Sequence, residues 1–324
     1  MLKRPIVLAA LAGIVLPILS QPVHSQGWPQ RPVKIIVPYP AGGNTDGIAR
    51  IIAQRLSGAL GQQFVVESRP GAGGAIAAEA VARAPADGYT LFVTAMAILA
   101  IVPAIGKTSY DPVKDFTPVS NIGTNSMVLA THPSFPATSL AEFVAHVRSQ
   151  PQKYSYAAGN IGSMGHLSME LFQKRAGLQI VPVMYKGGVA VLTDVIAGHV
   201  PMFIQPLSDV VPHAKTGALR LLAVSSDKRA PQIPDVPTFH ESGYPGFKTI
   251  SWNGLIAPAG TPRDIVDRIA QEISRAVKDP EIAQRLARFG VDPLGNSPQE
   301  FAAQIAADIA QWAEAVKLAG LQTQ

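Results

Sequence analysis

Two glycine-rich turns contain the residues best suited to hold a small anion. Each follows an apolar, strand-like run and precedes a helix-like segment, at residues 40–46 and 159–166. Glycines let backbone N–H groups approach a ligand, and a helix start adds unpaired donors and the positive end of the helix dipole. One turn from each half of the chain could therefore hold an anion from two sides. The expected ligand contacts are Tyr39, Ala41, Gly42, Gly43, Thr45 and Asp46 in the first turn and Gly159, Ile161, Gly162, Ser163, Met164 and His166 in the second. The backbone N–H groups near Gly42, Gly43, Gly162 and Ser163 are the predicted donors, assisted by the hydroxyls of Thr45 and Ser163.

The same turns also have a purely structural interpretation. Asn44, Thr45 or Asp46 could cap one helix and Ser163 the other, and turns of this kind occur in every α/β fold. Asp46 would repel an anion, so it either bonds to the backbone or pairs with an ammonium group on the ligand. Spacing alone leaves ligand binding and capping equally open.

Two further residues are added as possible contacts. Lys186 follows another predicted strand, in the sequence Tyr185-Lys186-Gly187-Gly188, and could attract an anion, although a solvated lysine explains it as well. Asp209 lies in the predicted loop after the strand at 200–204, and loops of this kind often carry binding residues.

Catalytic and metal-binding interpretations have less support. Ser163 with His166 could form a hydrolase pair, but Ile161 replaces the first glycine of a nucleophile elbow and no acidic residue is evident to orient the histidine. His166 and Glu170 lie one helical turn apart without a third ligand at matching spacing. The glycines at 71–74 lack the lysine and hydroxyl of a phosphate loop. We expect a protein without catalytic residues, metal or cofactor.

The elements that would position the two turns alternate between short apolar strands and helices, which predicts parallel sheets covered by helices. The first lobe is expected to contain strands at 33–37, 63–67 and 90–94, joined by helices. Extended stretches at 118–122 and 126–131 lead out of it, and 248–258 leads back. The second lobe is expected to contain helices at 140–149, 163–175 and 189–197 and strands at 154–158, 180–184, 200–204 and 219–225.

A helical tail closes the chain. Thr261-Pro262, Asp279-Pro280 and Ser297-Pro298 each place a capping residue before a proline at the first helical position. The last helix carries one apolar stripe, which predicts that it folds back on the first lobe. The stripe consists of Phe301, Ile305, Ile309, Trp312 and Val316.

The N-terminus predicts export. Lys3 and Arg4 precede an apolar run at 6–19 that is too short for a membrane span, and we place the cleavage site after Ser25, with Ser20 as the alternative. The signal peptide is thus 1–25, and the mature protein is expected to be soluble in the periplasm. The chain has no cysteine, so it can carry neither a lipid anchor on cysteine nor a disulfide.

Charge and composition argue against a nucleic-acid groove. The formal net charge of +5 would fall to +3 after loss of Lys3 and Arg4, aromatic residues make up 6%, and no Lys/Arg run exceeds two residues. A mild positive field is compatible with an anionic ligand without identifying it.

A series of short, distinctive segments runs along the chain. They are Arg31-Pro32, PYPAGGNTD (38–46), ESRPGAGG (67–74), ADGYTL (86–91), YDPVKDFTPV (110–119), the GS and GHL residues of 162–167, YKGG (185–188), TD with AGHV (193–200), PTFHESGYPGF (237–247) and GLIAPAGTP (254–262). In this order they resemble the solute-binding receptors of tripartite tricarboxylate transporters, often called Bug proteins. The resemblance covers essentially the whole mature length.

This resemblance implies a type II periplasmic-binding fold, with two α/β lobes joined by two crossover strands around a ligand cleft. Lobe 1 would comprise 26–124 and 251–324, and lobe 2 would comprise 125–250. Such a receptor captures a di- or tricarboxylate, an amino acid or an aromatic acid by hinge closure. It then delivers the solute to a large permease and a small membrane subunit.

Three questions stay open on this resemblance. A receptor that presents its closed form to a membrane sensor kinase would have the same sequence features. The resemblance also does not specify the oligomeric state, for which we expect a monomer. Ser68, Ala86, Ala41 and Met184 depart from the family's usual residues. Because Ala41 and Met184 border the expected cleft, the identity of the acid is also open.

Overall fold

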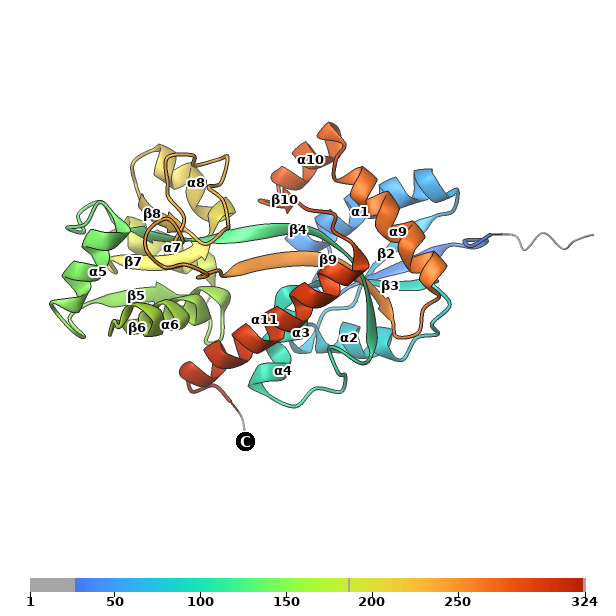
Figure 1. The fold of residues 1–324 in the computed structure, drawn as a ribbon, viewed down its shortest axis with the longest axis horizontal. Helices are drawn as coiled ribbons and strands as arrows, with labels where there is room; N and C mark the ends of the chain where they lie inside the picture. Colours follow the sequence, from blue (N-terminus) through green and yellow to red (C-terminus); the bar gives the residue numbers. More distant parts are fainter. Residues whose placement is uncertain (1–26, 186, 323–324) are drawn as a thin grey trace, which may run out of the picture.

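The computed structural model describes residues 27–185 and 187–322, so the predicted signal peptide and Lys186 lie outside the described part of the chain. Figure 1 shows two α/β lobes with two long strands passing between them. The first lobe begins with β1 (Val33–Val37), α1 (Asn44–Leu60), β2 (Phe64–Ser68), η1 (Ala72–Gly74), α2 (Ala75–Ala82), β3 (Thr90–Ala95), α3 (Met96–Ala100) and α4 (Val102–Ile105). The second contains α5 (Leu140–Arg148), β5 (Ser155–Ala158), α6 (Met164–Ala176), β6 (Val181–Met184), α7 (Gly188–Ile196), β7 (Met202–Pro206), α8 (Leu207–Lys215) and β8 (Arg220–Val224). The crossing strands are β4 (Phe116–Thr131) and β9 (Ile250–Pro258), and the tail consists of α9 (Arg263–Ala276), α10 (Pro280–Ala287), β10 (Asp292–Pro293) and α11 (Pro298–Leu318).

Both lobes share one curved sheet in the order β2-β1-β3-β9-β4-β7-β5-β6, with β8 and β10 each paired to β4. In the first lobe β1 runs parallel to β2 and β3, and its alternate residues enter different cores. Ile35 packs with α1 and α9, whereas Ile36 packs with α2, α3 and α11. In the second lobe β5 runs parallel to β6 and β7. The parallel strands bring the turns that precede α1, α6 and α7 to the carboxyl edges of the sheet, where ligands of such folds bind.

The two lobes are joined through strands that belong to both. β4 pairs with β9 over its first part and with β7 and β8 from Met127 onward. The sequence predicted two extended stretches separated by a break at 123–125. In the structure β4 is one continuous strand, and its pairing with β9 shifts in register instead of breaking. The lobe boundaries predicted at 124/125 and 250/251 fall within β4 and β9, and they remain a proposal because a continuous strand has no break that marks an edge.

The tail confirms two of the three predicted helix starts. The Asp279 carboxylate accepts hydrogen bonds from the N–H groups of Glu281 and Ile282, and Ser297 forms a reciprocal capping box with Glu300. The first start was wrong: α9 begins at Arg263, and the Thr261 hydroxyl donates to the Pro258 carbonyl instead of capping.

The last helix contacts both lobes. Phe301, Ile305, Trp312 and Val316 are buried, which confirms the predicted apolar stripe on the first lobe. α11 also lies against α6, where Glu314 pairs with Lys174. The sequence prediction did not include α3, α4 or α8.

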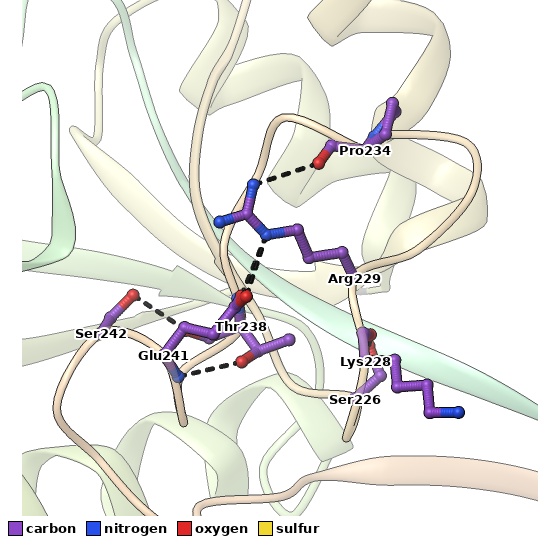
Figure 2. A network of polar contacts seen from close by, with 7 residues as sticks. All are labelled: Ser226, Lys228, Arg229, Pro234, Thr238, Glu241 and Ser242. Carbon is purple, nitrogen blue, oxygen red and sulfur yellow. Dashed lines mark hydrogen bonds and ion pairs between the residues drawn. The ribbon is translucent and has the colours of Figure 1, made fainter.

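A polar network fixes the long connection from β8 to β9 (Figure 2). The Arg229 guanidinium donates from Nε to both carboxylate oxygens of Glu241 at 3.1 Å and from Nη1 to the Pro234 carbonyl at 3.2 Å. The N–H of Thr238 donates to Glu241 at 2.7 Å, and the N–H of Glu241 donates to the Thr238 hydroxyl at 3.0 Å. Phe239 and Phe247 of this connection are buried in the core formed with α5 and α6, so the loop is an integral part of the second lobe.

None of the helices in the described part of the chain combines the length and apolar character of a membrane span.

Candidate functional site

The first predicted turn leads into a helix that no side chain caps. Gly43 is the N-cap residue of α1, and among the described residues no side-chain cap bonds to the N–H groups at the start of this helix. The Asn44 amide instead donates to the Phe289 carbonyl at 2.8 Å, and the Thr45 hydroxyl accepts from the Asn253 amide of β9 at 3.0 Å. The predicted capping roles of Asn44, Thr45 and Asp46 are therefore wrong, and the N–H groups at the start of α1 stay available to a ligand.

Asp46 shapes this turn from within. Asp46 is 2% exposed, and its side chain accepts from the Gly42 N–H at 2.9 Å, from Arg50 Nε at 2.8 Å and from the Ser68 hydroxyl at 3.4 Å. Burial raises the pKa of Asp46, but the bonds from Arg50, Gly42 and Ser68 together hold that pKa below its ordinary value. Of the two interpretations offered for Asp46, backbone bonding is the one observed, and Arg50 neutralises its charge.

The second turn is held by Ser163 and His166. The Ser163 hydroxyl accepts from the His166 N–H at 3.4 Å, which confirms its capping role at α6. His166 Nδ1 faces the Gly162 N–H at 3.2 Å, and its ring stacks on Tyr156. The imidazole is thus bonded to Gly162 rather than to the Ser163 hydroxyl, and burial lowers its pKa. This arrangement lacks the serine–histidine contact that a hydrolase needs.

The four backbone donors named from the sequence are engaged inside their own turns. The Gly42 N–H bonds to Asp46 and the Gly162 N–H to His166, as described. The Gly43 N–H donates to the Pro40 carbonyl at 3.3 Å, and the Ser163 N–H donates to the Asn160 carbonyl at 2.9 Å. Among the described residues, the first turn of α1 has no side-chain cap, whereas that of α6 is capped by Ser163.

Tyr39 and Met164 pack against one shared apolar cluster. The cluster contains Trp252 of β9 and Trp312 of α11, so it lies where the lobes meet. A Cβ built on Gly162 would be 3.1 Å from Ile105 of α4, which shows how closely the second turn approaches the first lobe.

The remaining predicted residues differ in their settings. Ala41, Gly42, Gly43 and Ile161 are exposed, whereas Gly159 is buried. His166 borders a hollow of about 460 Å³ beside α6 and the end of α11. Because His166 Nδ1 accepts the Gly162 N–H, we interpret His166 as a residue that stabilises the second turn.

Asp209 was predicted in a loop, but it lies in the first turn of α8. The helix forms although it contains Pro212, a residue that helix interiors disfavour. The Asp209 side chain is exposed, and the protein around it still raises its pKa by desolvation. Its neighbour Ser208 accepts from the Asn125 amide of β4 at 3.3 Å and lies directly against Gly290 of the first lobe. Asp209 thus lies beside a contact between the lobes.

Sequence reasoning missed Gln205. It is 7% exposed and stands at the end of β7, between the starts of α6 and α7. In the sequence, Gln205 could have been noticed as the one amide side chain beside an apolar strand. It lies one position beyond residue 204, where we predicted that strand to end. Among the described residues, no group of three or more side chains is arranged to hold a metal ion.

Gly165 provides a test of how tightly this edge is packed. A Cβ at Gly165 would lie 2.4 Å from the Ile204 carbonyl oxygen, a backbone atom that cannot move aside cheaply. Gly165→Ala is expected to cost about 2 kcal/mol in urea unfolding, because α6 must shift away from β7. The exposed helical Gly58, which has nothing within 4 Å of its Cβ position, is the matched control. Gly58→Ala should stabilise by up to about 1 kcal/mol. Equal effects at the two glycines would contradict this account of the packing.

The comparisons with known proteins show the family of the chain. The family described as "Tripartite tricarboxylate transporter family receptor" matches residues 48–321. The chain is 35% identical to Protein BugT of Bordetella pertussis over 320 residues, which cover 97% of each chain.

Two solved structures are also similar. R. palustris Rpa4515 with adipate is 39% identical and has a TM-score of 0.73, covering 91% of this chain and 99% of its own. A TctC solute-binding protein from Polaromonas, solved without ligand, is 26% identical and has a TM-score of 0.82, covering 90% and 99%. The chain therefore belongs to the tripartite tricarboxylate transporter receptor family, whose members are solute-binding receptors rather than enzymes.

Proposed function

We propose that this protein captures a small carboxylate-bearing solute between its two lobes and delivers it to a tripartite tricarboxylate transporter. The observation that carries the proposal is a pair of uncapped helix starts at the carboxyl edges of the sheet. α1 in the first lobe and α7 in the second each begin after a glycine, and within the described part of the chain neither start has a side-chain cap. Helices α5, α6, α10 and α11 have a side-chain cap, whereas α2, α8 and α9 lack one among the described residues, as α1 and α7 do. Uncapped starts suit a carboxylate, which supplies the missing acceptors and interacts favourably with the helix dipole.

Exposed apolar side chains near the second-lobe turns would contact the carbon skeleton of the solute. Ile161 is 66% exposed, Met184 is 37% exposed and Val189 is 82% exposed, and they flank the starts of α6 and α7. Apolar walls with a few convergent donors are the usual composition of small-molecule sites. Adipate, which is bound to the similar Rpa4515, has both features: two carboxylates and an apolar chain. Affinity in the micromolar range, about −8 kcal/mol, needs only a few charge-assisted hydrogen bonds beyond the ordering costs.

We further infer that the described conformation is the open one. The ligand-free Polaromonas protein superposes better than the adipate complex, although it is more distant in sequence. A difference in lobe orientation would explain this reversal. Closure by bending of β4 and β9 would follow binding, because a ligand that touches both lobes favours the closed state.

The cellular setting belongs to the same proposal. Residues 1–25 would direct export to the periplasm, and a large permease with a small membrane subunit would receive the solute from a monomeric receptor. The family description supports the transport role.

Calorimetry with matched acids and primary amides tests the carboxylate requirement. The panel would contain straight-chain dicarboxylates, hydroxy acids, acidic amino acids and aromatic acids, each paired with its amide. At least one acid should bind in the micromolar range, and its amide should bind more than tenfold more weakly because it carries no charge. An acid and amide that bind equally would contradict the proposal. Small-angle scattering should show a smaller radius of gyration with the bound acid.

A further inference from the structure

The second turn depends on a hydrogen bond that forms in only one protonation state of a histidine. The Gly162 N–H donates to Nδ1 of His166 at 3.2 Å. A backbone N–H can only donate, so Nδ1 must carry no proton, and the neutral imidazole then has its proton on Nε2. In a protonated imidazole both ring nitrogens are donors. Protonation of His166 would therefore place two donors against each other and break the bond to Gly162.

His166 holds this turn at two points, and only one of them can titrate. Its backbone N–H donates to the Ser163 hydroxyl at 3.4 Å, which caps α6 at every pH. Its ring holds Gly162, whose φ of 77° lies in the left-handed region. Loss of the ring contact thus leaves the helix start capped but frees the glycine before it.

The turn that would be freed lies at the expected solute site. Ile161, which is 66% exposed and a proposed contact for the carbon skeleton, directly precedes Gly162. On the other side of the same turn, the Cβ position of Gly159 is 3.7 Å from the Gly187 carbonyl carbon. A change in the conformation of Gly162 therefore alters the wall that the second lobe presents to the solute.

The surroundings of His166 favour the neutral ring. The residue is 5% exposed, and its ring stacks on Tyr156 of β5. Burial lowers the pKa of His166 below the ordinary value of 6.5, although the negative charge of Glu170 on α6 acts in the opposite direction. The Glu170 carboxylate is engaged by the Tyr156 hydroxyl at 2.6 Å and by the Gln173 amide at 3.0 Å. The ring is thus neutral at pH 7 and becomes charged in mild acid.

One other charged side chain lines the hollow beside His166. It is Lys174 of α6, which pairs with Glu314 of α11. The remaining described side chains around the hollow, from the segment 178–182, from the end of α11 and from Gln152 and Gln173, are apolar or carry amides. Tyr156, Glu170 and Lys174 are therefore the titratable groups that face the ring, and among them Glu170 is the one that opposes the effect of burial on His166.

We propose that His166 is a positioning residue that makes solute capture depend on pH: its neutral ring holds the second turn in the binding conformation, and its protonation releases Gly162 and weakens binding. This inference rests on the proposed receptor function and adds a regulation to it. A solute that needs the intact turn binds only the neutral fraction of the protein. Each pH unit below the pKa of His166 should then weaken binding by up to about tenfold.

His166→Asn tests the proposal because asparagine offers an acceptor that does not titrate. Its Oδ1 takes the place of Nδ1 and accepts from the Gly162 N–H at every pH. Calorimetry from pH 8 to 5 would use the tightest binder among adipate, succinate and benzoate. The ratio of the wild-type Kd to the variant Kd should be constant above pH 7 and rise about threefold or more by pH 5. Ionisation of the probe affects both proteins alike, so it cancels in the ratio.

His199→Asn is the matched control. His199 also belongs to the second lobe, but its side chain is 70% exposed and pairs with Asp194 instead of contacting the second turn. The ratio of the wild-type Kd to the Kd of this variant should stay constant from pH 8 to 5. A constant ratio for His166→Asn as well, or an equal rise for both variants, overturns the proposal.

Nitrogen NMR of the wild type tests the bond without any substitution, and so covers a variant that does not fold. At pH 7.5 the Nδ1 of His166 should have the chemical shift of an unprotonated nitrogen. On acidification the Gly162 amide signal should move with the same midpoint as the His166 ring. A proton on Nδ1 at pH 7.5, or a Gly162 signal that ignores the titration of the ring, overturns the proposal.

The outcomes separate this inference from the proposed function. If an acid binds and the wild type and His166→Asn have parallel pH profiles, His166 has a structural role alone and the receptor function stands. If no acid of the whole panel binds at pH 7.5, the proposed function fails. The NMR titration then still decides whether protonation of His166 releases Gly162.

Discussion

Replacing Asp46 with alanine is expected to lower the free energy of unfolding by about 2 to 3 kcal/mol and to weaken ligand binding at least tenfold. The substitution removes the buried acceptor of the Gly42 N–H and leaves Arg50 without its partner. Gly42 has φ 83°, a conformation that the bond to Asp46 helps to hold. Without it the turn before α1 loses its shape, and the donors at the helix start are no longer presented together. Urea unfolding and calorimetry measure the two effects.

Arg50→Met serves as the control for Asp46→Ala. It removes the ion pair, whose arginine side chain is 56% exposed, but keeps the bond from Gly42 to Asp46. It should therefore cost less stability and leave affinity within about twofold. If Asp46→Ala binds the ligand like the wild type, Asp46 does not shape the binding turn.

The pH dependence of the Asp46 contribution has a definite sign. Because the folded pKa is below the ordinary value of 3.8, the stabilisation is fully present above that value. It is lost as the pH falls through the folded pKa. The stability difference between wild type and Asp46→Ala should therefore be constant from pH 6 to 8 and shrink below about pH 4.

Asp308→Asn is expected to stabilise the protein at pH 7 to 8 by roughly 2 kcal/mol. Asp308 lies on α11 and accepts from the Trp252 indole N–H of β9 at 2.7 Å. Burial raises its pKa from 3.8 to about 6, although the Trp252 bond and the charge of Lys248 act in the opposite direction. An asparagine oxygen can still accept from Trp252 and carries no charge to desolvate.

The difference between wild type and Asp308→Asn should appear in a defined pH window. The native state binds more protons than the unfolded chain between pH 3.8 and about 6, so the Asp308 contribution falls as the pH rises through that range. The two proteins should be equally stable near pH 3.5 and differ fully above pH 7, as measured by urea unfolding. Asp267→Asn, at an exposed ion pair on α9, should change stability by less than about 0.5 kcal/mol at every pH. A difference between wild type and Asp308→Asn that is independent of pH would rule out the buried charge as its cause.

The sequence by itself determined most of the strands and the longer helices, and it predicted the two turns as binding turns. Apolar runs located most strands within one or two residues, because local periodicity reports which side chains must be buried. The Asp279 and Ser297 caps could also be predicted, since each satisfies donors only two or three residues away. The ordered family segments supported the two-lobed fold and the class of receptor.

Tertiary structure alone decided which donors and acceptors remain free. The sequence could not show that Thr45 bonds to Asn253, 208 positions away, or that the β7 amide of Gln205 lies beneath the start of α7. It also could not show that β4 is continuous, because pairing with β9 on one side and β7 and β8 on the other overrides the local break at Gly123. A hydrogen bond between neighbours in sequence leaves a local pattern. A contact between residues far apart in the sequence is determined only by how their segments pack.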